Sequence, residues 1–196
     1  IVVEPMATLI NGIYYRLNKG KLTAKVIQRG SSERNIAIPK IIEFNGVSYL
    51  VTSIGEYAFS GCESLNSINI PDSVTSIEDY AFGDCSYLTS VTIPTSVTSI
   101  GRKAFACCFK LPAITIPNSV TSIGGWAFAG CYNLTNITIP ASVKSIGGMV
   151  LLGCNLITSI TFQGTIAQWK KIEFGGGWSD QVPATVVHCT DGDVEI

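Results

Sequence analysis

Seven cysteines are the residues of this 196-residue chain with the most obvious chemistry, and five of them recur every 23 residues: Cys62, Cys85, Cys108, Cys131 and Cys154. If 23 residues make one turn of a stacked coil, successive cysteines lie about 4.8 Å apart with parallel side chains. A relaxed disulfide needs Cβ atoms roughly 3.5–4.5 Å apart and converging vectors. A straight column also cannot surround one metal ion tetrahedrally. We therefore expect a column of reduced thiols in an apolar core.

The remaining candidates for chemistry lie near the C-terminal end of the sequence. His188 is the only histidine, so a Cys–His or Ser–His mechanism would have to use it. Its neighbour Cys189 points to the opposite face if both lie on a strand, which makes a poor dyad. The acidic pair in 191–193 lacks the longer ligand series of a calcium loop and fits a turn. We expect an exposed imidazole at His188, and we predict no catalytic, cofactor-binding or metal-ligating residue.

The elements that position these residues repeat with the same period as the cysteines. The stretch 93–115, IPTSVTSIGRKAFACCFKLPAIT, recurs one period earlier at 70–92 and later at 116–138 and 139–161. A fixed period of this length is typical of a solenoid, in which several coils must stack before a continuous core is buried. The register first matches fully at Ile54. We predict about five 23-residue repeats.

Each repeat has an apolar pattern that predicts its local structure. Ile114 and Ile116 alternate with polar residues as on a strand, and 97–100 forms a second short extended segment. Ala104, Phe105 and Cys108 have the i, i+1, i+4 spacing of a short helical turn. The predicted fold class is therefore an α/β repeat solenoid of short strands and short helical turns.

The ends of the chain depart from the repeat and predict β-rich caps. Residues 1–50 contain two hairpin signals, around 18–20 and at Asn45-Gly46, together with a lengthened first repeat. Residues 162–196 contain a short helix with Thr165 as its N-cap and a final strand, ATVVHC. Trp169 and Trp178 are expected to pack there. Residues 51–161 hold the repeats, and the caps cover the exposed ends of the core.

Composition excludes two classes of partner. The chain has 13 basic and 14 acidic residues, and only 14% of its residues are charged. It therefore has neither the clustered basic face of a nucleic-acid-binding protein nor a polybasic helix for anionic lipid. No apolar run reaches the ~20 residues that cross a bilayer, so no membrane insertion is expected. No signal peptide is visible, and a mature fragment that has lost its signal would look the same.

Residues that vary between repeats, or that face outward, are the candidates for binding. Two columns of small polar side chains follow the main strand, and two further columns containing aromatic residues follow the turns. Threonine and serine also suit exposed strands without any ligand, and the aromatic side chains could equally shield the coil edges. Surface aromatics are nevertheless enriched at interaction sites. The predicted binding residues are Tyr57, Tyr80, Lys103, Trp126, Phe109, Tyr132, Ser90, Thr92, Thr115, Asn136 and Thr138.

The pattern IPxSVTSIGxxAFxGCxxLTxIT over 51–161 resembles the BspA-like, Treponema pallidum type, leucine-rich repeats. The resemblance implies a right-handed coil of the leucine-rich-repeat type in a secreted or surface-attached bacterial protein. Some members of that family act as adhesins for host matrix proteins or other microbes. Local departures from the pattern are Cys107, Pro112 and the pair Val150-Leu151.

These observations lead to a function hypothesis and one rival. We predict a non-catalytic, extracellular or cell-surface binding protein, adhesin-like and monomeric, without cofactors. Its partner would be a protein or glycan on host or neighbouring microbial cells. The rival is a structural spacer within a larger surface protein. An enzyme would need a deep pocket around His188.

Overall fold

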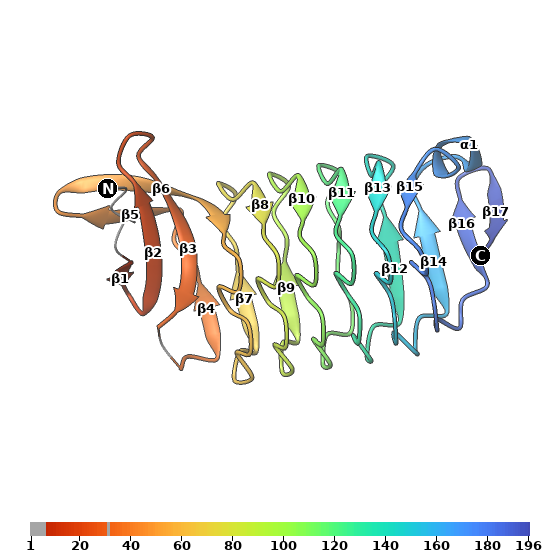
Figure 1. Cartoon of the computed structure of the whole chain (residues 1–196), viewed down its shortest axis with the longest axis horizontal. Helices are drawn as coiled ribbons and strands as arrows, with labels where there is room; N and C mark the ends of the chain where they lie inside the picture. The colour runs from red at the N-terminus through yellow and green to blue at the C-terminus, as the bar shows by residue number, and fades with distance from the viewer. Residues whose placement is uncertain (1–6, 31) are drawn as a thin grey trace.

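The computed structural model describes residues 7–30 and 32–196 and shows an elongated stack of coils, with the first and last described residues towards opposite ends (Figure 1). Successive coils lie in register, each residue beside its counterpart 23 positions away, as the parallel pairs Ser99–Ser122 and Ile100–Ile123 show. The predicted solenoid is therefore confirmed. Residues 1–6 and 31 of the expected N-terminal cap lie outside the described residues.

One long sheet runs the length of the molecule along one side of the coils (Figure 1). Its central members are two-residue strands, one per coil, formed by the Ser-Ile of the TSI motif. Antiparallel hairpins extend it at the N-terminal end. Its ten strands are β1 (Thr8–Ile10), β2 (Ile13–Asn18), β3 (Thr23–Arg29), β5 (Ile41–Phe44), β6 (Val47–Ile54), β8 (Ser76–Ile77), β10 (Ser99–Ile100), β11 (Ser122–Ile123), β13 (Ser145–Ile146) and β15 (Glu173–Phe174).

Two shorter sheets occupy the side of the coils formed by the LTxIT motif. The first consists of β4 (Asn35–Ala37), β7 (Ser67–Asn69) and β9 (Ser90–Thr92). The second consists of β12 (Asn136–Ile139), β14 (Ser159–Phe162), β16 (Val186–Cys189) and β17 (Gly192–Glu195). Between β9 and β12, the coil of 93–115 contributes a single bridge, Thr115 to Thr138.

Pro112 explains why these two sheets are separate. In neighbouring coils the residue at this position donates its N–H across the ladder, as Thr89 does to the Asn66 carbonyl and Thr158 to the Thr135 carbonyl. Proline has no N–H, so the bond to the Thr89 carbonyl cannot form. The departure at Pro112 is therefore not merely local, because it interrupts one face of the solenoid.

The predicted helical turns are wrong. The AFxGC segment of each coil folds as stacked turns that hydrogen-bond to the next coil, as in Phe105 N–H to the Ala127 carbonyl. Two residues per coil have positive φ in this region, such as Lys103 at 53° and Cys107 at 58°. A left-handed residue interrupts a right-handed helix, so the i, i+4 apolar spacing here reflects a turn and not a helix.

The core is built from columns of identical side chains that repeat from coil to coil. Phe59, Phe82, Phe105 and Phe128 are fully buried and stack with ring centroids 5.2 to 5.9 Å apart. The repeated cysteines beside them are unpaired thiols. Each of the last four donates to the carbonyl of a phenylalanine in the preceding coil at 3.1 to 3.3 Å.

Polar residues of the SVTSI motif also have structural partners. Ser73, Ser96, Ser119 and Ser142 each donate to a valine carbonyl in the preceding coil at 2.5 to 2.7 Å. Thr75, Thr98 and Thr121 each donate to the carbonyl of the threonine 23 residues earlier at 3.2 to 3.3 Å. At Gly124, which follows the TSI motif, glycine is needed because a Cβ would overlap the backbone of the preceding coil at Arg102.

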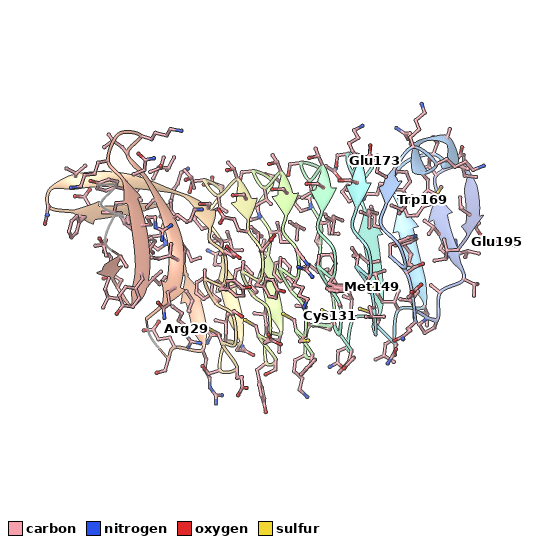
Figure 2. The ribbon with its side chains drawn as sticks, viewed as in Figure 1. Arg29, Cys131, Met149, Trp169, Glu173 and Glu195 are labelled. Carbon is pink, nitrogen blue, oxygen red and sulfur yellow. The ribbon has the colours of Figure 1, made fainter. Side chains whose placement is uncertain are left out.

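The hairpins, the short helix and the final strand that the sequence predicts are present near the two ends of the described chain. The hairpins β2–β3 and β5–β6 are present, the second turning at Asn45-Gly46, where both residues have positive φ. Helix α1 (Ile166–Trp169) begins at the N-cap Thr165. Trp169, which Figure 2 labels near the C-terminal end of the stack, packs against Trp178 with ring centroids 5.4 Å apart. The parallel ladders continue past residue 161 through β13–β15 and β14–β16.

Candidate functional site

Four predicted binding residues come together as one continuous ladder of side chains on successive turns. The rings of Tyr57 and Tyr80 stack with centroids 4.6 Å apart. Lys103 Nζ lies 5.2 Å from the Tyr80 ring and 4.8 Å from the Trp126 ring, so one ammonium bridges two aromatic faces. Met149 occupies the same position in the next coil (Figure 2). We call Tyr57, Tyr80, Lys103, Trp126 and Met149 the turn ladder.

The backbone of the turn ladder is left-handed at every member. Their φ angles lie between 53° and 59°. Large side chains are rare in this conformation, which costs roughly 1–2 kcal/mol per residue and is relaxed only for glycine. The second left-handed column follows that rule in three of five coils, with Gly61, Gly130 and Gly153. The turn ladder contains no glycine. Each of its five coils therefore has a large side chain at a position whose backbone conformation favours glycine.

Arg102 adds a second cation to the ladder. Its guanidinium lies 4.9 Å from the Trp126 ring centroid. Cation–π contacts of this kind contribute about 0.5–1 kcal/mol at exposed sites. Arg102 stands where neighbouring repeats have Asp79 and Gly125, so this second cation is particular to the coil of 93–115.

A smaller aromatic pair lies on the next turn of the coil. Phe109 and Tyr132 stack with centroids 5.0 Å apart, and their side chains are 37% and 50% exposed. Tyr87 and Leu156, which occupy the position after this column, are 61% and 50% exposed and were missed. Aligning the repeats would have found them, because that position varies while the core positions do not.

The small polar columns on the strands are placed outward but are not continuous. Ser90 and Thr92 lie on β9, and Asn136 and Thr138 lie on β12. Thr115 lies in the interrupted coil, joined to β12 by one bridge. The polar strand face that the sequence predicts is therefore divided into two parts.

His188 forms a pair that the sequence analysis did not anticipate. Its Nδ1 lies 2.9 Å from an Asp193 carboxylate oxygen, because β16 and β17 place the two residues opposite each other. Both side chains are about half exposed, at 47% and 57%. They stand on an open sheet face beside a surface hollow of about 660 Å³ that includes Thr161 and Cys189. The expected exposed imidazole is confirmed.

The described part of the chain does not support the remaining candidates for metal-binding or thiol chemistry. Asp191 accepts a hydrogen bond from the Ile166 N–H at 2.7 Å, so it caps α1. In residues 7–30 and 32–196, no three His, Cys, Asp or Glu side chains gather as metal ligands. Over the same residues, no helix is both long and apolar enough to cross a membrane. Burial raises the pKa of Cys85 to about 12 and that of Cys154 to about 11, so these thiols stay protonated.

Comparison with solved structures identifies similar solenoids from bacteria. A leucine-rich repeat protein from Bacteroides ovatus is 30% identical, with a TM-score of 0.79 over 92% of this chain and 46% of that one. A leucine-rich cell surface protein from Faecalibacterium prausnitzii is 28% identical, with a TM-score of 0.76 over 95% and 55%. The chain thus spans about half the length of these two proteins. The Treponema pallidum leucine-rich repeat protein, at 24% identity and a TM-score of 0.73, shares the fold.

The repeats themselves match a known family. No match was found among curated proteins. The family model described as BspA type leucine-rich repeat region matches residues 52–176 in six copies, one more than the five repeats counted in the sequence. The match covers more than half of the chain and runs past residue 161 into the expected C-terminal cap. The chain therefore belongs to the family of proteins with BspA type leucine-rich repeats.

Proposed function

We propose that this protein is a non-catalytic binding protein of the cell surface, adhesin-like, which engages its partner through the turn ladder. One observation carries the proposal. Five successive coils hold large side chains in a left-handed conformation that glycine would relax. Backbone strain of this kind clusters at sites where it serves function.

The chemistry of the ladder supports binding rather than turnover. Aromatic rings and cations are the side chains that dominate interface energetics. Here they are stacked on each other and held by a rigid core, so little side-chain entropy remains to be lost on association. Met149 adds an adaptable apolar contact at the end of the row, with its side chain 37% exposed.

A structurally similar protein supports placement at the cell surface. The similar protein from Faecalibacterium prausnitzii is described as a cell surface protein. The partner that we propose is a protein or glycan on a host or neighbouring cell. The alternative is a spacer without a ligand, in which the turn ladder only shields the coil edges. The experiment below distinguishes the two functions.

The test replaces two ladder residues by the residue that their backbone favours. In Tyr80→Gly/Trp126→Gly, glycine relieves strain and removes two rings. We expect the unfolding temperature to change little and the attachment of protein-coated beads to epithelial cells, immobilised laminin, fibronectin and mucin to fall at least about tenfold, a change of 1.4 kcal/mol. Tyr87→Ala, which removes an exposed ring outside the ladder, is the matched control.

The two readings give opposite results in this experiment. If attachment is unchanged while the unfolding temperature drops by about 2–4 °C for each kcal/mol lost, the rings are packing residues and the spacer reading holds. If wild-type beads attach to none of the surfaces, the adhesin proposal is wrong for these partners.

A further inference from the structure

A second candidate site lies at the N-terminal end, away from the turn ladder. The strands β1, β2, β3, β5 and β6 lie together at this end (Figure 1), and residues from all five line a hollow of about 1060 Å³. Ligand sites typically measure about 300–1,000 Å³. Its lining combines cations with apolar side chains and hydroxyls: Leu9, Arg16, Lys19, Lys25, Phe44 and Thr52.

Two of the cations that line this hollow are close to each other on neighbouring strands, which is electrostatically unfavourable. Arg16 and Lys25 are directly opposite each other on the antiparallel strands β2 and β3. Like charges in such a pair lower stability. Glu78 relieves one of them, at 2.6 Å from Lys25 Nζ. No described acidic residue lines the hollow, and across residues 7–30 and 32–196 neither Arg16 nor Lys19 forms an ion pair.

The N-terminal end of the chain carries a net positive charge. Residues 1–50 contain seven Lys or Arg and three Glu, whereas residues 51–196 contain six Lys or Arg and eleven Asp or Glu. The chain's net charge of -1 therefore conceals a basic end and an acidic body. This charge distribution favours an anionic ligand for the hollow, because an anion is attracted to this end and repelled by the rest.

The apolar residues that line the hollow indicate which kind of anion would fit. Leu9 is 53% exposed at the rim, and Phe44 packs against the core from the opposite hairpin. A polysulfated glycan presents charge but no apolar group to such walls. An extended acidic peptide presents both, because alternate side chains point to the same face.

We propose that the hollow binds an acidic, extended segment of a partner protein that carries an aromatic or large aliphatic side chain. The carboxylates face Arg16 and Lys19, and the apolar side chain lies between Leu9 and Phe44. The site is independent of the turn ladder, so either proposal can fail without the other.

The test uses the full chain and a fluorescein-labelled peptide of sequence Glu-Glu-Phe-Glu-Glu, followed by fluorescence anisotropy. We expect saturable binding that weakens as salt is raised. Arg16→Glu/Lys19→Glu should weaken it at least about tenfold. Lys110→Glu/Lys144→Glu, which makes the same change of charge at exposed positions elsewhere, should leave the affinity within about twofold of wild type.

A second arm locates the apolar contact. The peptide Glu-Glu-Ser-Glu-Glu should bind more weakly than the phenylalanine peptide to the wild type. Leu9→Ser should reduce that difference, because a double-mutant cycle isolates the contact between the two side chains. Equal loss for both peptides would remove the apolar half of the proposal.

Three results would overturn the proposal. One is equal binding of the uncharged peptide Gln-Gln-Phe-Gln-Gln. Another is binding of heparin, sensitive to Arg16→Glu/Lys19→Glu, without binding of the acidic peptide, which would assign the hollow to anionic glycans. The third is salt-sensitive self-association in sedimentation velocity that Arg16→Glu/Lys19→Glu abolishes, which would make the occupant a second copy of this chain.

Discussion

The backbone angle at each position of the coil decides what a side chain can contribute. Two positions per coil are left-handed, and they are used differently. One column keeps rings, a lysine and a methionine, whereas the other holds Gly61, Gly130 and Gly153 together with Asp84 and Cys107. Aspartate tolerates this conformation better than most residues, but cysteine has no such advantage. Cys107 therefore carries strain that brings no contact comparable to the turn ladder.

Cys107→Gly should stabilise the protein by about 1 kcal/mol, because glycine adopts positive φ without steric cost. The measurement is the urea midpoint at constant m-value. Gly130→Cys, the reverse change at the equivalent position, should destabilise by a similar amount. Equal stability of both variants would show that the φ of 58° at Cys107 carries no strain.

The buried thiols make stability depend on alkaline pH. Burial raises the pKa of Cys85 from 9.0 to about 12 and that of Cys154 to about 11, and it also raises the pKa of Cys108 and Cys131. The unfolded chain releases these protons first, so stability is full below about pH 9 and falls as pH rises toward the folded values. Urea midpoints should therefore drop between about pH 8 and about pH 10.5.

The matched variant for this prediction is Cys85→Ala/Cys154→Ala. It should be less stable than the wild type at neutral pH, because buried atoms are lost. Its midpoint should nevertheless change less between the two pH values. An unchanged pH dependence would mean that these thiols are not the groups that titrate.

At the scale of the element, sequence periodicity predicted strands better than turns. The Asn45-Gly46 signal identified a hairpin correctly, and the alternation of the LTxIT motif identified the strands β7, β9, β12 and β14. At Ile114 and Ile116 the predicted strand is absent, because this coil forms only the bridge from Thr115 to Thr138. The i, i+4 spacing of Ala104 and Cys108 did not distinguish a helix from a stacked turn. The recurring glycine at 61, 130 and 153 was the signal that could have done so, since glycine marks left-handed backbone.

Pro112 shows how one residue can interrupt a strand that the repeat pattern predicts. Pro112→Thr should restore the N–H donor to the Thr89 carbonyl and join the two short sheets. We expect a gain of about 0.5–1.5 kcal/mol, the net value of one hydrogen bond, measured by urea unfolding. Pro112→Ala should act in the same direction, because alanine also supplies the N–H. Loss of stability in both variants would show that the stiffness of proline outweighs the missing bond.

At the scale of the whole molecule, the repeat predicts the stacking of the coils but not the side-chain arrangement on their surface. The 23-residue period fixed which residues are equivalent, and the core columns followed because coils can bury their apolar face only against each other. The turn ladder was predicted as a column, but its cation–π bridge at Lys103 depended on side-chain rotamers that no pattern encodes. The basic end escaped notice because the overall charge balance hides it.

Removal of one whole coil tests the repeat as the unit of folding. Deletion of 93–115 joins Thr92 to Ile116, which reproduces the Thr-Ile junction of the other coils and removes Pro112. We expect a cooperatively unfolding protein with an unchanged circular dichroism spectrum. Deletion of 94–115 leaves one extra residue, which reverses the faces of the following strand, and it should not fold stably. Stable folding of both would refute the strict register.

The interruption at Pro112 also has a mechanical consequence. The long sheet and the stacked turns continue through the coil of 93–115, whereas the opposite side retains one bridge. Bending stiffness is therefore lower on that side than on the other. A load that pulls the two ends of the solenoid apart should open this coil first, with the continuous long sheet as the line about which the two halves rotate.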